Sequence, residues 1–161
     1  MNQQVVVVTG GSYVIGFGIA SYFARRNFLV ILAARNPDRG EAARARNENE
    51  GGRAVFITVD VQNEDSITAL FRRSIEQFGR VDVLCNNAGI ERYARADQYS
   101  STDFDEIHGT NLRGMFLCAK YAFPHLKTQT GSIVNISSVQ GIANEANIWA
   151  YAEETGGILG L

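Results

Sequence analysis

The sequence predicts an α/β protein built on a doubly wound parallel sheet of about five strands, in the order 3-2-1-4-5. Two observations predict this class. Short apolar runs alternate with longer helical segments along all 161 residues, and glycine-rich or polar residues follow the apolar runs. Strands that alternate with helices in this way pair in parallel through right-handed crossovers. We therefore expect one domain over residues 1–161, in which the chain stops after the start of a sixth helix.

The expected strands are short apolar runs. The first, residues 5–8, consists of four valines, which is typical of a strand buried on both faces. The other strands are expected at residues 28–33, 54–59, 81–85 and 132–137. The expected helices cover residues 15–27, 37–50, 63–78 and 102–127, and a last one begins near residue 147. Pro124 should disturb the fourth helix near its end.

Composition and charge limit the function classes. A 45% hydrophobic chain of this length can bury one sizeable core. Its 15 basic and 17 acidic residues are scattered, which excludes a basic field for nucleic acid or a membrane surface. No apolar run approaches the roughly 18 residues that span a bilayer, and we expect a cytoplasmic protein. Cys85 and Cys118 lack metal-ligand spacing, so we expect two buried thiols and no metal site.

Unusual residues gather where the expected strands end. Thr9-Gly10-Gly11 follows the first strand, Arg35 the second, Asp60-Val61 the third, Asn86-Asn87-Ala88-Gly89 the fourth and Ser137-Ser138 the fifth. In a doubly wound sheet these ends meet at one rim, and ligands bind there. The pattern therefore predicts a ligand site at this rim; the alternative for a glycine turn taken alone is a tight connection between strand and helix.

Five strings of the sequence carry a family resemblance, in order and at fitting spacing: TGGSYVIGFGIA, NNAG, NLRGMF, GSIVNISS and AYAEETGGILGL. A serine thirteen residues before a tyrosine is a further sign. On these features the whole chain resembles the short-chain dehydrogenase/reductase family, and its single domain resembles a Rossmann-type domain. The resemblance implies a nicotinamide dinucleotide across the strand ends and hydride transfer to or from a small carbonyl or alcohol. It places the catalytic groups at Asn111, Ser138, Tyr151 and position 155.

The physical roles of the cofactor-binding positions can be argued separately. Gly10 permits a turn with positive φ, and the N-terminus of the next helix offers unpaired N–H groups to a pyrophosphate. Asp60 is placed to accept from the adenine amino group, or alternatively to cap a turn. Arg35 stands where an acidic residue would hold the 2′-hydroxyl of NAD. A guanidinium at this position favours the 2′-phosphate of NADP, with NAD possible. The alternative interpretation of Arg35 is a solvated arginine on the surface. The expected cofactor-binding residues are Gly10, Ser12, Ile15, Gly16, Arg35, Asp60, Val61, Asn87, Ala88 and Gly89.

Val14 is the first departure from the family pattern. In TGxxxGxG the second glycine falls at this position, where it lets the backbone approach the pyrophosphate. A β-branched residue there collides with cofactor or moves the loop, unless the register shifts to use Gly16 and Gly18. A backbone strain of about 1–3 kcal/mol would weaken binding about ten- to a hundredfold, so we expect weak binding.

Position 155 is the second departure. The family's lysine, which holds the nicotinamide ribose and lowers the pKa of the family's tyrosine, is replaced by Thr155. Threonine carries no charge for either task. Glu153 and Glu154 do not share the helix face of Tyr151 and Thr155, which are one turn apart.

The end of the chain is the third departure, because family members continue through further strands that cover the substrate. Two functions therefore compete: an NADP-dependent carbonyl reductase or alcohol dehydrogenase with reduced chemistry, and a non-catalytic remnant that no longer binds cofactor productively. In both cases we expect a homo-oligomer, which buries either the edge of residues 132–136 or the long-helix face at residues 112–123.

Overall fold

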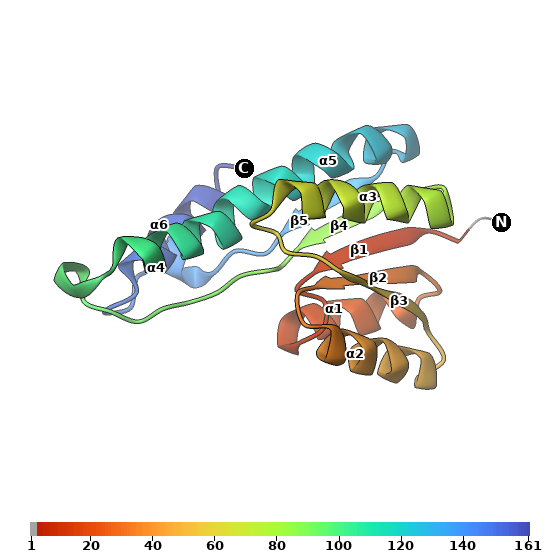
Figure 1. Ribbon diagram of the computed structural model, residues 1–161, viewed down its shortest axis with the longest axis horizontal. Coiled ribbons are helices and arrows are strands. Elements are labelled where there is room, and N and C mark those ends of the chain that lie inside the picture. The colour runs from red at the N-terminus through yellow and green to blue at the C-terminus, as the bar shows by residue number, and fades with distance from the viewer. Residues whose placement is uncertain (1–2) are drawn as a thin grey trace.

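All the strands of the computed structural model, which describes residues 3–161, lie in one parallel sheet in the order β3-β2-β1-β4-β5 (Figure 1). The predicted fold class and strand order are therefore confirmed. The strands are β1 (Val5–Thr9), β2 (Leu29–Ala34), β3 (Arg53–Thr58), β4 (Val83–Asn86) and β5 (Ser132–Asn135). The helices are α1 (Val14–Ala24), α2 (Pro37–Asn49), α3 (Glu64–Phe78), α4 (Ser101–His108), α5 (Gly114–Gln129) and α6 (Trp149–Ile158).

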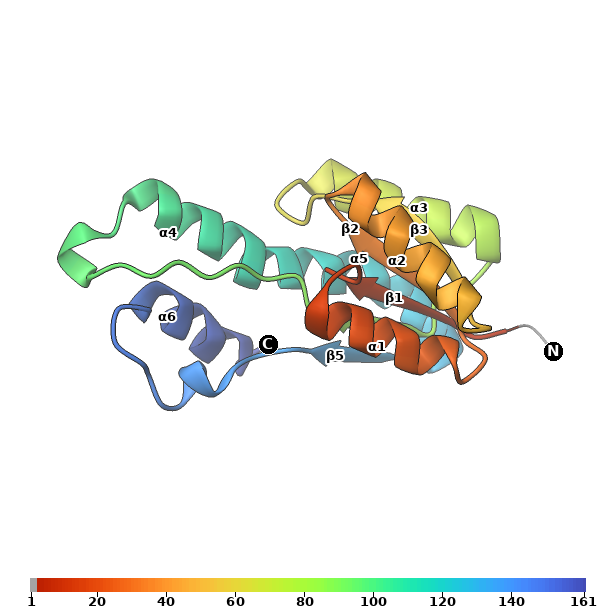
Figure 2. The ribbon, with the colours of Figure 1, turned by 90° about the horizontal axis from the view of Figure 1, so that it is seen from below.

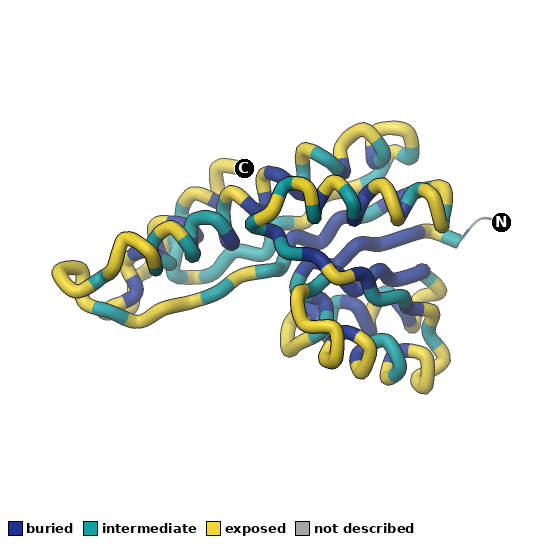
Figure 3. Tube along the Cα trace, in the orientation of Figure 1, coloured by how far each residue is buried: buried dark blue, intermediate teal, exposed yellow. Residues whose placement is uncertain are grey.

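The sheet is covered on both faces, so β1 is buried throughout (Figure 3). Val5 and Val7 pack in the cluster that contains residues of α3 and α5, while Val6 and Val8 pack in the cluster that contains residues of α1 and α2. This alternation follows from the strand's period of two. It explains why an uninterrupted valine run marks the central strand.

Local sequence fixes two of the helix starts. The Asn36 side chain accepts from Arg39 N–H at 2.9 Å, and Pro37 occupies the first helical position of α2. The Asn63 side chain likewise accepts from Ser66 N–H at 3.0 Å at the start of α3. Both caps satisfy a backbone N–H of the first helical turn that has no partner within the helix.

The expected helix at residues 102–127 is divided. A π-helical turn over Gly109–Arg113 joins α4 to α5, so the segment is continuous but locally wide. The expectation that Pro124 disturbs the helix near its end is wrong, because α5 continues to Gln129. Buried Leu126, two residues beyond the proline, keeps the last turn packed on the core.

The last part of the chain differs from the expected boundaries. β5 ends at Asn135, two residues early, and α6 begins at Trp149 because Asn147 has a left-handed φ of 66° that a helix cannot include. Figure 2 shows α4 and α6 reaching beyond the sheet. β5 is an edge of the described sheet, with Ile133 and Val134 exposed. Over residues 3–161, no helix combines the length and apolar character needed to span a membrane.

Candidate active site

Thr9, the last residue of β1, joins the loop after β1 to the loop after β4. Its hydroxyl oxygen accepts hydrogen bonds from the backbone N–H groups of Asn87 at 3.0 Å and Ala88 at 3.1 Å. In return, Asn87 Nδ2 donates to the Thr9 carbonyl at 3.0 Å. The two loops therefore form one connected floor at the carboxyl ends of adjacent strands, where doubly wound sheets bind ligands.

The glycine turn between β1 and α1 is closely packed. Gly10 has a φ of 64°, and a Cβ atom on Gly16 would lie 2.2 Å from the Gly10 carbonyl oxygen. Neither a side-chain cap nor an acidic first-turn residue covers the start of α1. Its first N–H groups are thus available to an anion, as a pyrophosphate site requires.

Val14 occupies the strained position of this turn. It has a φ of 39°, in the region that favours glycine, and the residue is 64% exposed. Gly16 is packed against Gly10, whereas a Cβ on Gly18 would meet nothing within 4 Å. The register has therefore not shifted to Gly16 and Gly18. Valine stands directly where the pattern has glycine, at a cost of about 1–3 kcal/mol.

A cavity of about 390 Å³ opens beside the glycine turn. Arg35 and Arg39 both line it, and no acidic residue is among its described lining residues. The Arg39 guanidinium lies over the Tyr13 ring, 5.4 Å from its centre. Of the predicted cofactor-binding residues, the cavity brings together Gly10, Ser12, Ile15, Gly16, Arg35, Val61, Asn87, Ala88 and Gly89.

Asp60 does not line this cavity. Its Oδ1 accepts from Gln62 N–H at 3.0 Å, and its own N–H donates to Ser66 Oγ at 3.0 Å. The carboxylate therefore stabilises the turn before α3, which was the alternative for this residue. Binding of the adenine amino group by Asp60 stays a prediction.

A second cavity, of about 330 Å³, adjoins the first across the strand ends. It brings together the four predicted catalytic positions: Asn111, Ser138, Tyr151 and Thr155. The two cavities share the following lining residues: Ile15, Asn87, Ala88, Gly89 and Ile90. An elongated ligand can thus occupy both and place one end beside Tyr151.

The polar groups of the second cavity are partly committed to the backbone. Thr155 is buried, and its hydroxyl is within hydrogen-bond distance of the Tyr151 carbonyl at 2.8 Å and the Ala152 carbonyl at 3.0 Å. Ser138 Oγ accepts from Gln140 N–H at 3.3 Å. Thr155 therefore presents neither a charge nor a free hydroxyl donor to the cavity.

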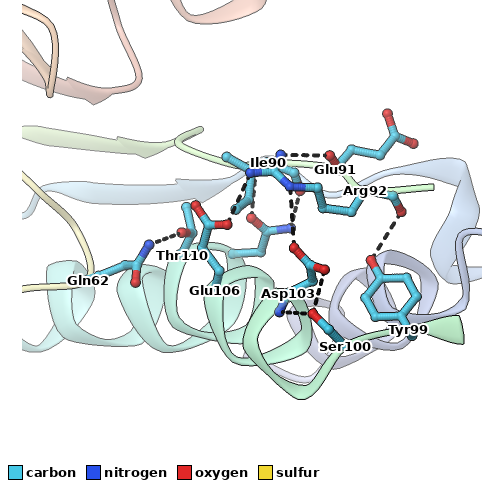
Figure 4. A network of polar contacts seen from close by, with 10 residues as sticks. Gln62, Ile90, Glu91, Arg92, Tyr99, Ser100, Asp103, Glu106 and Thr110 are labelled. Carbon is cyan, nitrogen blue, oxygen red and sulfur yellow. Dashed lines mark hydrogen bonds and ion pairs between the residues drawn. The ribbon is translucent and has the colours of Figure 1, made fainter. Parts of the chain in front are cut away.

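Asn111 holds the loop that follows β4. Its side chain accepts from Ile90 N–H and donates to the Ile90 carbonyl, both at 2.9 Å. Beyond Ile90, the Arg92 guanidinium pairs with Glu106 at 3.0 Å, and the Tyr99 hydroxyl donates to the Arg92 carbonyl at 3.1 Å (Figure 4). The Asn111 side chain thus fixes the backbone at Ile90 in the loop after β4, and its part in catalysis stays a prediction.

Known proteins that are similar to this chain agree with this geometry. Residues 4–160 match the family model for short chain dehydrogenases. The chain belongs to the short-chain dehydrogenase/reductase family. It is 36% identical over 162 residues to an uncharacterized oxidoreductase, YxjF, of Bacillus subtilis, covering 100% of this chain and 63% of that protein. It is 34% identical to the 3-oxoacyl-[acyl-carrier-protein] reductase FabG of Chlamydia muridarum, covering 98% of this chain and 64% of that protein.

A solved structure shares the architecture of this short-chain dehydrogenase/reductase chain. The alcohol dehydrogenase from the archaeon Thermococcus sibiricus, complexed with 5-hydroxy-NADP, superposes with a TM-score of 0.92 at 28% identity. The alignment covers 97% of this chain and 67% of that one. With coverages of 63% and 64%, the chain spans less than two thirds of the length of the two curated relatives, YxjF and FabG.

Sequence reasoning missed several cavity residues. Arg39 had a usable signal, because a helix that starts at Pro37 turns its first residues toward the same rim as Arg35. Thr110, whose hydroxyl accepts from Gln62 Nε2 at 2.9 Å, and Ile90 had none. Their positions depend on packing between segments that are distant in sequence.

Proposed function

We propose that this short-chain dehydrogenase/reductase chain binds NADP(H) in preference to NAD(H), and that its hydride transfer to or from a carbonyl or alcohol is weak or lost. The charge around the first cavity carries the cofactor preference. Arg35 and Arg39 line that cavity, and none of its described lining residues is acidic. A guanidinium binds a phosphate through paired, charge-assisted hydrogen bonds, while the acid that would hold the 2′-hydroxyl of NAD is missing.

The remaining residues fit the rest of the dinucleotide. Gly10 and the uncapped start of α1 would hold the pyrophosphate, and the backbone from Asn87 to Gly89 would lie along a ribose. The nicotinamide ring of a bound cofactor supplies or accepts the hydride. The relative from Thermococcus sibiricus, solved with 5-hydroxy-NADP, supports the choice of dinucleotide.

Weak or lost chemistry follows from position 155. Tyr151 and Ser138 line the second cavity, so a proton donor and a hydroxyl are present. Thr155, however, is buried and uncharged, with its hydroxyl directed at carbonyls of its own helix. Nothing at this position stabilises a phenolate or holds the nicotinamide ribose.

Calorimetric titration with NADP⁺ and NAD⁺ tests the cofactor preference. Arg35→Ala and Arg39→Ala should each weaken NADP⁺ binding by about tenfold, because a hydrogen bond to a charged group contributes about 1.5 kcal/mol or more. Neither change should affect NAD⁺ binding. Arg72→Ala, an exposed arginine on α3, is the matched control. Equal affinity of the parent chain for the two dinucleotides would contradict the preference, and binding of neither would favour a non-binding remnant.

A spectrophotometric assay tests the chemistry. The chain is mixed with NADPH and a panel of ketones and diketones, and the loss of absorbance is compared with a boiled control. We expect turnover close to that control. Rapid turnover that disappears in Tyr151→Phe would show that catalysis has been retained.

A further inference from the structure

We propose that His108, Glu153 and Glu154 bind a divalent transition-metal ion of the zinc type, which links the end of α4 to α6. One ligand atom from each of these side chains lies within 4.8 Å of the other two. His108 is the last residue of α4, and the two glutamates belong to α6. Imidazole nitrogen with carboxylate oxygens is a donor set that Zn²⁺ binds, usually with water as the fourth ligand.

The distances suit such an ion after small movements. Zinc holds nitrogen and oxygen ligands at about 2.0–2.2 Å, which separates tetrahedral ligand atoms by roughly 3.4 Å. The three atoms are already within 4.8 Å of one another, and the closest pair, His108 Nδ1 and Glu154 Oε1, are 2.6 Å apart. Side-chain rotations that move the ligand atoms by about 1 Å would therefore bring all three atoms around one ion.

An independent observation is the unsatisfied carboxylate of Glu154. This side chain is fully buried, and its Oε2 has no hydrogen-bond partner within the described part of the chain. Burial raises the pKa of the Glu154 carboxyl, His108 opposes this rise, and the neighbouring Glu153 carboxyl adds to it. A buried carboxylate with one orphan oxygen beside a second carboxylate is costly in its charged form, and a cation bound between the two would offset that cost.

The cluster is accessible and separate from the dinucleotide site. The His108 side chain is 43% exposed and Glu153 is exposed, so an ion with its water can enter. Tyr151 and Thr155 line the second cavity, but Glu153 and Glu154 do not. The ion would thus hold α6 through residues that do not line the second cavity. A failure of this site would leave the proposed cofactor preference untouched.

Titration of the chelator-treated chain with ZnCl₂ and with CoCl₂ tests the proposal, by calorimetry and by the visible absorption of bound Co²⁺. We expect one ion per chain. Glu153→Gln should weaken binding more than about tenfold, since even changes behind the ligands cost about 10- to 100-fold. Glu153 is exposed, so this variant should fold normally. His108→Asn should have the same effect.

The chain offers matched controls. Its other histidine gives His125→Asn, and the exposed Glu76, on α3, gives Glu76→Gln; both should bind zinc like the parent. Circular dichroism establishes that each variant is folded. Lack of saturation at high micromolar zinc, or unchanged affinity in Glu153→Gln, would overturn the proposal and leave His108 and Glu154 as a simple ion pair. Displacement of zinc by equimolar Mg²⁺ would overturn the assignment to a transition metal.

Discussion

Val14→Gly should stabilise the fold, although most substitutions by glycine destabilise. Val14 has a φ of 39°, and non-glycine residues pay about 1–3 kcal/mol for such backbone. Relief of this strain stabilises the folded chain. Glycine also gives the unfolded chain more conformational freedom, which offsets about 0.5–1 kcal/mol of that stabilisation. Because Val14 is 64% exposed, little packing is lost when its side chain is removed. The net increase in the free energy of unfolding is up to about 2.5 kcal/mol, or up to roughly 10 °C in Tm for a chain of this size.

The same variant should also bind NADP⁺ more tightly, for a different reason. The sequence-based expectation that backbone strain weakens binding needs a correction, because the φ of 39° is already present without cofactor and strain common to both states does not change affinity. A side chain that occupies the pyrophosphate position does change affinity. Val14 lines the first cavity at the uncapped start of α1, so its removal should tighten binding by about tenfold. Thermal melts report the strain, and calorimetric titration reports the steric effect.

Val139→Gly is the matched control for the melts. Val139 is 68% exposed and is not among the residues with positive φ, so the same change there should cost about 0.5–1 kcal/mol. If Val14→Gly lowered Tm as Val139→Gly does, residue 14 would not be strained. If Tm rose but affinity stayed the same, the valine side chain would lie outside the path of the pyrophosphate.

Four further outcomes are expected. Thr155→Lys alone should leave NADPH turnover at limiting cofactor about tenfold below that of Val14→Gly/Thr155→Lys, because Val14 still weakens binding; equal turnover of the two variants in the absorbance assay would contradict this. Burial raises the pKa of Cys85 to about 11 and of Cys118 to about 12, so neither thiol of the folded chain should react with iodoacetamide at pH 8. Since both values lie above the usual 9.0, the stability that these thiols contribute is present below pH 9 and is lost as the pH rises through 11, which melts at increasing pH would show. The chain should sediment as a homo-oligomer and become more monomeric in Val134→Lys if the β5 edge is the contact; an unchanged oligomer in that variant would indicate the α5 face instead.

The fold was predictable because its signals are local. The valine run of β1 and the glycine turn after it specify a buried strand and its exit without any knowledge of distant residues. The polar strand ends were predictable for the same reason, since parallel strands bring their carboxyl ends to one rim. The cavity residues Arg35 and Asn87 followed from that rule alone.

The errors arise where distant segments meet. The sequence predicts that Glu154 faces away from Tyr151, but it does not show that Glu154 is buried against His108, 46 residues earlier. The sequence also gives no sign of the π-helical turn at Gly109–Arg113, because its conformation depends on packing rather than on propensity.

Val14 and Thr155 should act independently on the kinetic constants, because they lie in different parts of the site. Val14 lines the first cavity and not the second, while Thr155 lines the second and not the first. Substitution at residue 14 should therefore change the KM for NADPH alone, whereas Thr155→Lys should change kcat through Tyr151 and the KM through the nicotinamide ribose. Sites that share no partner combine additively in free energy, within about 0.5 kcal/mol. The double variant Val14→Gly/Thr155→Lys should thus show the product of the two single effects on kcat/KM. A much larger gain would mean that the cofactor couples the two positions, as it would if a correctly seated pyrophosphate were needed to bring the nicotinamide to Tyr151.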